Sequence, residues 1–191
     1  MRLAHLLAAA VLAAAPALAS AATVAPVDRF NALELHGGGT VTIRQAAVQR
    51  VTVIEATSHR AQVEVVDRGD GGKLILAPCR GVCWGPNRFE VLVETPVMSS
   101  VSIMGGGHIV AEGNFAPQGA VSAVIHGGGV IDLKTMPAQS ASAAIHGGGK
   151  IVVAAQNSLS ASIAGGGQIR YLGQPTVSTS IHGGGSVDPV R

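Results

Sequence analysis

The chain has 191 residues, of which 47% are hydrophobic and only 13% are charged, and its formal net charge at pH 7 is +2. This nearly neutral balance argues against a nucleic-acid-binding protein. Aromatic residues make up 3% of the chain, so no platform for stacking bases or sugars is evident.

The first residues have the pattern of a secretory signal peptide. Arg2 is followed by an apolar run over residues 3–18, and small residues up to Ala21 offer cleavage sites. We therefore assign residues 1–21 to a signal peptide and residues 22–191 to one domain, with a core at about 30–187. This predicts export to the periplasm or the cell exterior. No later segment is apolar for long enough to span a membrane.

Six glycine triplets punctuate the remaining chain. An aliphatic residue and one variable residue precede each triplet, and a short β-prone run follows it. The triplets begin at Gly37, Gly105, Gly127, Gly147, Gly165 and Gly183. From the second triplet onward they start 22, 20, 18 and 18 residues apart, which is typical of one supersecondary unit stacked on the next.

The N-terminal half is less regular, because the first two triplets start 68 residues apart. Strand-like stretches lie at residues 48–56, 62–66, 73–76 and 89–93, with a turn at 67–72. We expect these strands to form irregular coils or a small sheet that caps the stack.

Cys79 and Cys83 are the only cysteines. In an exported chain this pair predicts a local disulfide, whose short loop would contribute about 2 kcal/mol. A redox or metal role is the weaker alternative, because the spacing is not Cys-x-x-Cys and no histidine is near in sequence.

Residues alternate with a period of two on both sides of the later triplets. Around the third triplet, Val121, Ala123, Ile125, Ile131 and Leu133 share an apolar face, and the other face is mixed. The next three copies keep the same parity. Strands repeated in this way can stack in register, with glycine at each corner. We therefore predict an all-β fold, a single-stranded, right-handed parallel β-helix with a less regular N-terminal cap.

A second architecture is compatible with the same pattern. Gly-Gly between two alternating strands is a strong hairpin signal, so six hairpins could instead form an antiparallel meander or barrel.

No catalytic or cofactor site is predicted. The His-Gly-Gly-Gly tetrapeptide resembles an esterase oxyanion loop, but it occurs four times and no Gly-x-Ser-x-Gly elbow accompanies it. Calcium β-rolls need an aspartate within a nonapeptide repeat, which is missing here. The 11 acidic residues lie mostly outside the repeats, so no carboxylate cluster of a polysaccharide-cleaving enzyme is visible.

Four histidines occupy the variable position before a triplet. Stacking would align them in one outward column with the order His36, Met104, His126, His146, Ala164, His182. Neighbouring strands lie about 4.8 Å apart, so His126 and His146 could approach each other, while Ala164 would separate His182. No metal site is assigned, and His126, His146 and His182 are only weak zinc or copper candidates.

Several segments resemble the GIN domain, the head-domain family of putative auto-transporter adhesins. They are the repeated aliphatic-x-Gly-x-Gly unit, residues 30–33, the segment 71–75 and the strand at 91–96, within a match over about 30–187. The family usually has Gly-Ser-Gly-Asp where this chain has Gly-Gly-Gly, so no role of that aspartate is carried over. The resemblance implies a parallel β-helix in a secreted or envelope protein and supplies no catalytic residues.

The sequence thus predicts a non-enzymatic binding or structural module at the cell envelope, similar to an adhesin head. Its partner would be an envelope protein or glycan, and a homo-oligomer stays open. The alternative is a hydrolase or lyase acting on envelope polysaccharide. A carboxylate cluster in a groove would favour the enzyme, whereas a ladder of Ser, Thr and His would favour the module.

Overall fold

The computed structural model describes residues 22–58, 61–66, 71–79 and 88–190, and the predicted signal peptide lies outside these ranges. Within them the chain is all-β, with fifteen strands and no helix. The described residues accordingly contain no helix that could cross a membrane.

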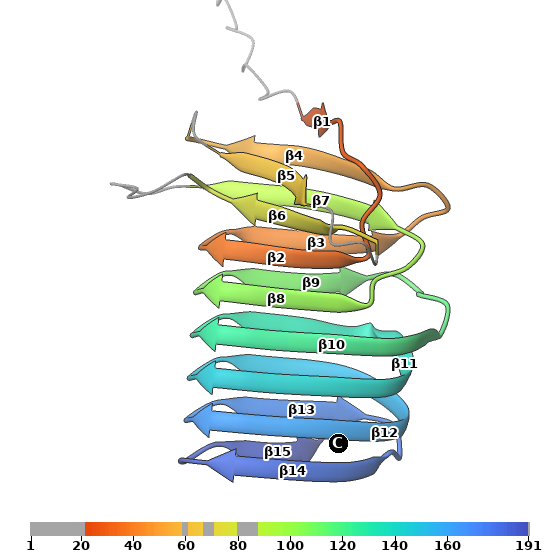
Figure 1. Cartoon of the computed structure of the whole chain (residues 1–191), viewed down its shortest axis with the longest axis vertical. Helices are drawn as coiled ribbons and strands as arrows, with labels where there is room; N and C mark the ends of the chain where they lie inside the picture. Colours follow the sequence, from red (N-terminus) through yellow and green to blue (C-terminus); the bar gives the residue numbers. More distant parts are fainter. Residues whose placement is uncertain (1–21, 59–60, 67–70, 80–87, 191) are drawn as a thin grey trace, which may run out of the picture.

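All fifteen strands belong to one hydrogen-bonded sheet, which folds into two layers (Figure 1). The front layer in that view contains β5 (Gln62–Val66), β6 (Lys73–Ala77), β2 (Ala32–Gly37), β8 (Ser100–Gly105), β10 (Gln118–Gly127) and β14 (Thr176–His182). The rear layer contains β1 (Thr23–Ala25), β4 (Arg50–Ala56), β7 (Phe89–Thr95), β3 (Thr40–Gln45), β9 (His108–Glu112), β13 (Gln168–Leu172) and β15 (Ser186–Pro189).

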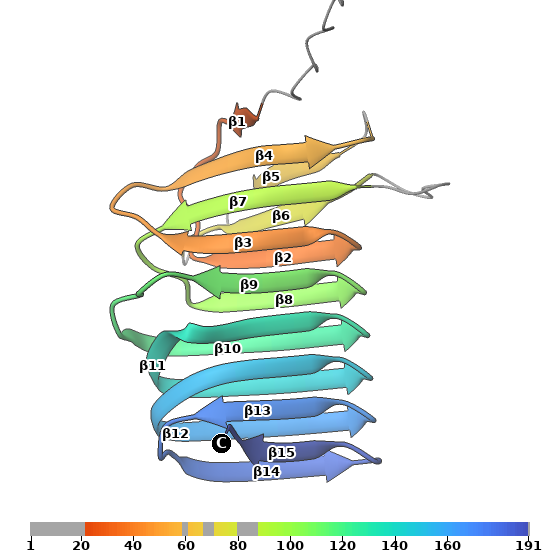
Figure 2. The ribbon, with the colours of Figure 1, turned by 180° about the vertical axis from the view of Figure 1, so that it is seen from behind.

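The two longest strands join these layers. β11 (Val130–Gly147) and β12 (Lys150–Gly165) begin in the rear layer and bend into the front layer (Figure 2). β11 accordingly pairs with β9 near its start and with β10 near its end. The sheet is therefore nearly closed, like a barrel, around the apolar interior.

Parallel pairing in a constant register unites the repeats. From β2 and β3 to β14 and β15, every pair of neighbouring strands runs parallel. Ile103, Ile125, Ile145, Ile163 and Ile181 form one continuous column in this register. Among the described strands, the segments directly before and after a triplet lie in opposite layers (Figure 1). Where the two flanking strands do pair, as β10 with β11, they pair in parallel and through other segments, not as a hairpin across the triplet. The hairpins that Gly-Gly also predicted are therefore not formed.

The N-terminal half folds back over the first strand pair. β6 and β7 pair in parallel with β2 and β3, and β5, β4 and β1 then add as antiparallel strands. In Figure 1 these strands lie above β2 and β3, whereas β8 and β9 lie below them. Chain order and stacking order therefore differ in this half.

The predicted alternation is confirmed by burial. Val121, Ala123, Ile125, Ile131 and Leu133 are all buried and belong to one continuous core cluster. Repeated short strands thus build a large interior that is mostly aliphatic, with Phe30, Phe89 and Phe115 as the buried aromatic residues among those described, because each aliphatic residue packs on its equivalents in the neighbouring repeats.

The three glycines of a triplet have different roles. Gly105 has a φ of +136°, and a Cβ on it would lie 2.8 Å from the Gly37 carbonyl oxygen. A Cβ on Gly107 would overlap the Leu35 side chain, whereas one on Gly106 would meet nothing within 4 Å. The first and third positions therefore require glycine for close stacking, and the second does not.

Candidate binding face

Three columns of side chains point outward from the front layer. Along the order β2, β8, β10, β11, β12 and β14, the first column contains Ala32, Ser100, Ser122, Ser142, Ser160 and Ser178. The second contains Glu34, Ser102, Val124, Ala144, Ser162 and Ser180. The third is the column predicted from the triplets, with His36, Met104, His126, His146, Ala164 and His182. We call these three columns together the outer face.

The structure brings two of the four column histidines together. The rings of His126 and His146 are stacked, with centroids 4.7 Å apart and an interplanar angle of 5°. His182 is separated from His146 by Ala164, as expected from the register. Among the described residues, no group of three His, Cys, Asp or Glu side chains could hold a metal ion.

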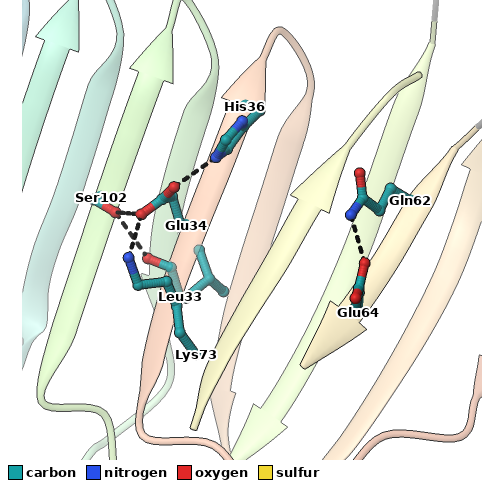
Figure 3. Close-up of polar contacts among 7 residues, drawn as sticks. All are labelled: Leu33, Glu34, His36, Gln62, Glu64, Lys73 and Ser102. Carbon is teal, nitrogen blue, oxygen red and sulfur yellow. Dashed lines mark hydrogen bonds and ion pairs between the residues drawn. The ribbon is translucent and has the colours of Figure 1, made fainter. Parts of the chain in front are cut away.

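His36 belongs instead to a small polar cluster at the other end of the column (Figure 3). The Glu34 carboxylate accepts a hydrogen bond from Lys73 Nζ at 2.5 Å, and its other oxygen lies 2.5 Å from His36 Nε2. Ser102 Oγ, 3.5 Å from this carboxylate, also donates to the Leu33 carbonyl at 3.3 Å. The cluster therefore links the neighbouring strands β6, β2 and β8.

The electrostatic balance at Glu34 favours the carboxylate. Burial of the carboxyl would raise its pKa, but the hydrogen bonds and positive charge of Lys73 and the contact with His36 outweigh burial, so the pKa of Glu34 is lowered. Sequence reasoning missed this cluster, because Lys73 reaches Glu34 only through the pairing of β6 with β2. A second polar pair in Figure 3, Gln62 with Glu64, lies within β5 and is held by a 2.7 Å hydrogen bond.

A groove of about 520 Å³ crosses the outer face along the first column. We call it the serine groove, because eight of its twelve lining residues carry hydroxyl groups. The lining consists of Ser99, Ala120, Val121, Ser122, Ser140, Ala141, Ser142, Ser158, Leu159, Ser160, Thr176 and Ser178. It contains no charged group and no aromatic ring.

The position of the serine groove follows from the bend in β11 and β12. The pairing of these strands changes register between Leu133 and Pro137 and again between Ala138 and Ser140. These shifts lie between the start of β11, which pairs with β9, and its later part, which pairs with β10. Val121, Ala141 and Leu159 are buried and form the apolar base of the groove. Hydroxyls on adjacent strands face each other there, with Ser158 Oγ donating to Ser140 Oγ at 3.0 Å. The volume lies in the range of small-molecule sites.

Two carboxylates lie elsewhere, in a pocket of about 390 Å³ on the rear layer beside Gly39 and Thr40. Glu55 and Glu90 are cross-strand neighbours in the pairing of β4 with β7, and both line this pocket together with Arg88. Arg88 Nη1 lies 3.7 Å from Glu55 Oε1, and its side chain is 77% exposed. Glu90 is exposed as well. This is the geometry of a solvated surface ion pair.

The predicted disulfide falls at the edge of the described chain. Cys79 follows β6, whereas Cys83 lies outside the described residues. The pairing of Cys79 with Cys83 therefore stays a prediction.

Comparisons with known proteins agree with this all-β architecture. The family model described as "Putative auto-transporter adhesin, head GIN domain" matches residues 29–120 and 117–175. A comparison with curated proteins finds no match.

Several solved structures match most of this chain. A putative adhesin from Bacteroides fragilis has a TM-score of 0.51 and 18% identity, over 89% of this chain and 96% of that one. A putative adhesin from Parabacteroides distasonis has a TM-score of 0.40 and 19% identity, over 89% of this chain and 96% of that one. A putative cell adhesion protein from Clostridium sporogenes has a TM-score of 0.43 and 12% identity, over 88% of this chain and 98% of that one.

Proposed function

Because this chain belongs to the GIN domain family of putative auto-transporter adhesin heads, we propose that it is a non-enzymatic binding module that attaches to a partner at the cell envelope. The serine groove is the observation that carries this proposal. It is the part of the outer face where polar groups converge on an apolar base, as in typical ligand sites.

The lining of the groove favours a neutral glycan as the partner. Each hydroxyl can both donate and accept a hydrogen bond, which matches the hydroxyl groups of a sugar. The groove offers no charge to pair with an acidic ligand and no ring for stacking. Recognition would therefore depend on hydrogen bonds above the apolar base formed by Val121, Ala141 and Leu159.

Binding of the purified protein to an array of neutral and acidic envelope glycans tests this proposal. We expect binding to neutral chains and at least a tenfold loss, about 1.4 kcal/mol, in Ser142→Arg and Ser160→Arg, because each arginine fills the groove. His108→Arg places the same side chain at an exposed position of β9 on the rear layer and should bind like the wild type. Unchanged binding by both groove variants would rule out this site.

An envelope protein is the partner to expect if the array gives no signal. A pull-down from envelope extract, repeated with His126→Ala and His146→Ala and with the two groove variants, separates the serine groove from the histidine column. Capture that survives enzymatic removal of glycans would identify a protein partner and overturn the glycan proposal.

The alternative function is a hydrolase or lyase acting on envelope polysaccharide. The pocket with Glu55 and Glu90 is the observation that favours it. The ion pair with Arg88 and the exposure of the pocket argue against it, because a general acid or base in such enzymes works in a more enclosed setting. Release of reducing ends from envelope polysaccharide, abolished by Glu55→Gln or Glu90→Gln, would establish the enzyme.

We further infer the finer architecture and the location of the protein. The parallel registers support a single-stranded, right-handed parallel β-helix, since crossovers between parallel strands are right-handed in nearly all proteins. The N-terminal sequence supports a signal peptide at residues 1–21 and export to the periplasm or cell exterior. The domain would then comprise residues 22–191, with a disulfide between Cys79 and Cys83.

A further inference from the structure

The last pair of strands in the stack is covered on one side only. β14 pairs with β12 and β15 pairs with β13, and neither has another partner among the described strands. In both ribbon views these two strands form the lower end of the stack (Figures 1 and 2). Their outer backbone edges are therefore available for pairing.

The apolar core opens at the same end. Val177 and Ile181 continue the inward columns of Leu159 and Ile163. Ile163 is fully buried, whereas Ile181 is 41% exposed. Covering β14 with one more strand would complete the packing that every preceding isoleucine of this column already has.

The two ends of the stack differ in how their edges are protected. At the N-terminal end the antiparallel strands β4, β5 and β1 cover β7 and β6, and β4 carries Arg50 and Glu55. β14 reads TVSTSIH, with no carboxylate, lysine, arginine or proline. Charges and prolines are the usual means of preventing edge-to-edge association, so this edge is suited to pairing.

We propose that β14 is a dimerisation edge, which pairs in antiparallel orientation with β14 of a second copy of this chain. A twofold axis through Thr179 and normal to the front layer places Val177 opposite Ile181 of the second copy. It also places Ser178 opposite Ser180, so inward residues meet inward residues and hydroxyls meet hydroxyls. No like charges meet along this edge, and such self-complementary twofold contacts are the commonest in homo-oligomers.

The arrangement has a consequence for binding that rests on the proposed function. An axis normal to the front layer keeps the outer faces of both copies on the same side, so two serine grooves would face one surface. Such bivalency raises apparent affinity for a repetitive target without any new contact.

Analytical ultracentrifugation of the purified protein over a micromolar concentration series tests the edge. We expect a dimer in the wild type and a monomer in Ile181→Lys. Met104→Lys is the matched control, because Met104 is 42% exposed in the middle of the stack, and it should remain dimeric. Circular dichroism and a thermal melt establish that each variant is folded. A monomeric wild type, or a folded Ile181→Lys that remains dimeric, overturns the proposal.

A cross-linking measurement tests the register in case the lysine variant does not fold. Directly opposed residues of antiparallel strands have Cβ atoms about 4.5–5.5 Å apart, so Thr179→Cys should form a covalent dimer under mild oxidation. Ser162→Cys, exposed on β12, should give no more covalent dimer than the wild type. Equal yields from the two variants would refute pairing through β14. Dimerisation is read without any ligand, so its failure is distinguishable from a failure of glycan binding.

Discussion

The imidazole rings of His126 and His146 lie parallel on neighbouring strands, with centroids 4.7 Å apart and planes inclined by 5°. A metal ion binds in the plane of an imidazole, about 2.0–2.1 Å from its nitrogen. Two parallel rings on adjacent strands cannot both direct a lone pair at the same ion. The stacked pair is therefore a pair of side chains aligned by strand register and not a preformed metal site.

Calorimetric titration with zinc and copper should give no micromolar binding. We expect the wild type and His146→Ala to show the same small heats, because His182 lies two strands from His146 and no third ligand is close among the described residues. Stoichiometric binding that disappears in both His126→Ala and His146→Ala would show that the rings reorient and form a site.

The glycine triplets predict opposite effects of one substitution at adjacent positions. Gly105→Ala places a Cβ 2.8 Å from the Gly37 carbonyl oxygen at a φ of +136°, so we expect destabilisation of at least about 2 kcal/mol. Gly106→Ala meets nothing within 4 Å. It should be neutral or stabilising by about 0.4–1 kcal/mol, because alanine restricts the unfolded chain.

Urea unfolding of the two alanine variants measures this difference. Equal losses of stability in Gly105→Ala and Gly106→Ala would mean that every position of the triplet needs the conformational freedom of glycine, and that close stacking is not the cause. Gly127→Ala and Gly128→Ala, which have the same surroundings in the next repeat, should reproduce the result.

The repeats explain which parts of the fold could be predicted from the sequence. Identical residue types at identical positions fix the register, so the isoleucine column and the alignment of His126 with His146 follow from the spacing alone. The strands β4 to β7 carry no such repeat. Their place beyond β2 and β3 depends on long-range pairing, which also brings Lys73 to Glu34.

The sequence predicts the outward direction of the serines in the serine groove, but not the groove itself. The alternation indicates that Ser122 and Ser142 point outward, but the groove depends on the bend of β11 and β12, whose pairing shifts register twice between Leu133 and Ser140. A period of two contains no information about such a bend. The glycine triplets were predicted to be corners, yet only the first and third positions are sterically required to be glycine.

Cys79 and Cys83 are predicted to be oxidised in the exported protein. Peptide mass spectrometry without reduction should recover them in one cross-linked peptide, and thiol titration of the unfolded protein should find no free thiol. Reduction should lower the free energy of unfolding by about 2 kcal/mol, because the closed loop is short. Two titratable thiols in protein isolated from the periplasm or medium would contradict the disulfide.

The Glu34 cluster should make the folded state sensitive to acid. The folded-state pKa of Glu34 is lowered below its unfolded value, which is about 4.3. Stabilisation by the carboxylate is therefore fully present above that value and is lost as the pH falls through the lower folded-state pKa. Glu34→Gln should be destabilised on the order of 1 kcal/mol at pH 7, because Lys73 loses its charged acceptor.

The pH dependence separates this interaction from a general effect of charge removal. The difference in unfolding free energy between wild type and Glu34→Gln should shrink toward zero below the folded-state pKa, where the wild-type carboxyl is protonated. Glu112→Gln is the control, since Glu112 forms an exposed ion pair with Arg44 at 3.3 Å and such pairs contribute little. The unfolding free energy of Glu112→Gln should stay close to that of the wild type at every pH. A gap between wild type and Glu34→Gln that is constant from pH 7 to acid would mean that Glu34 stabilises the strands by packing and not by its charge.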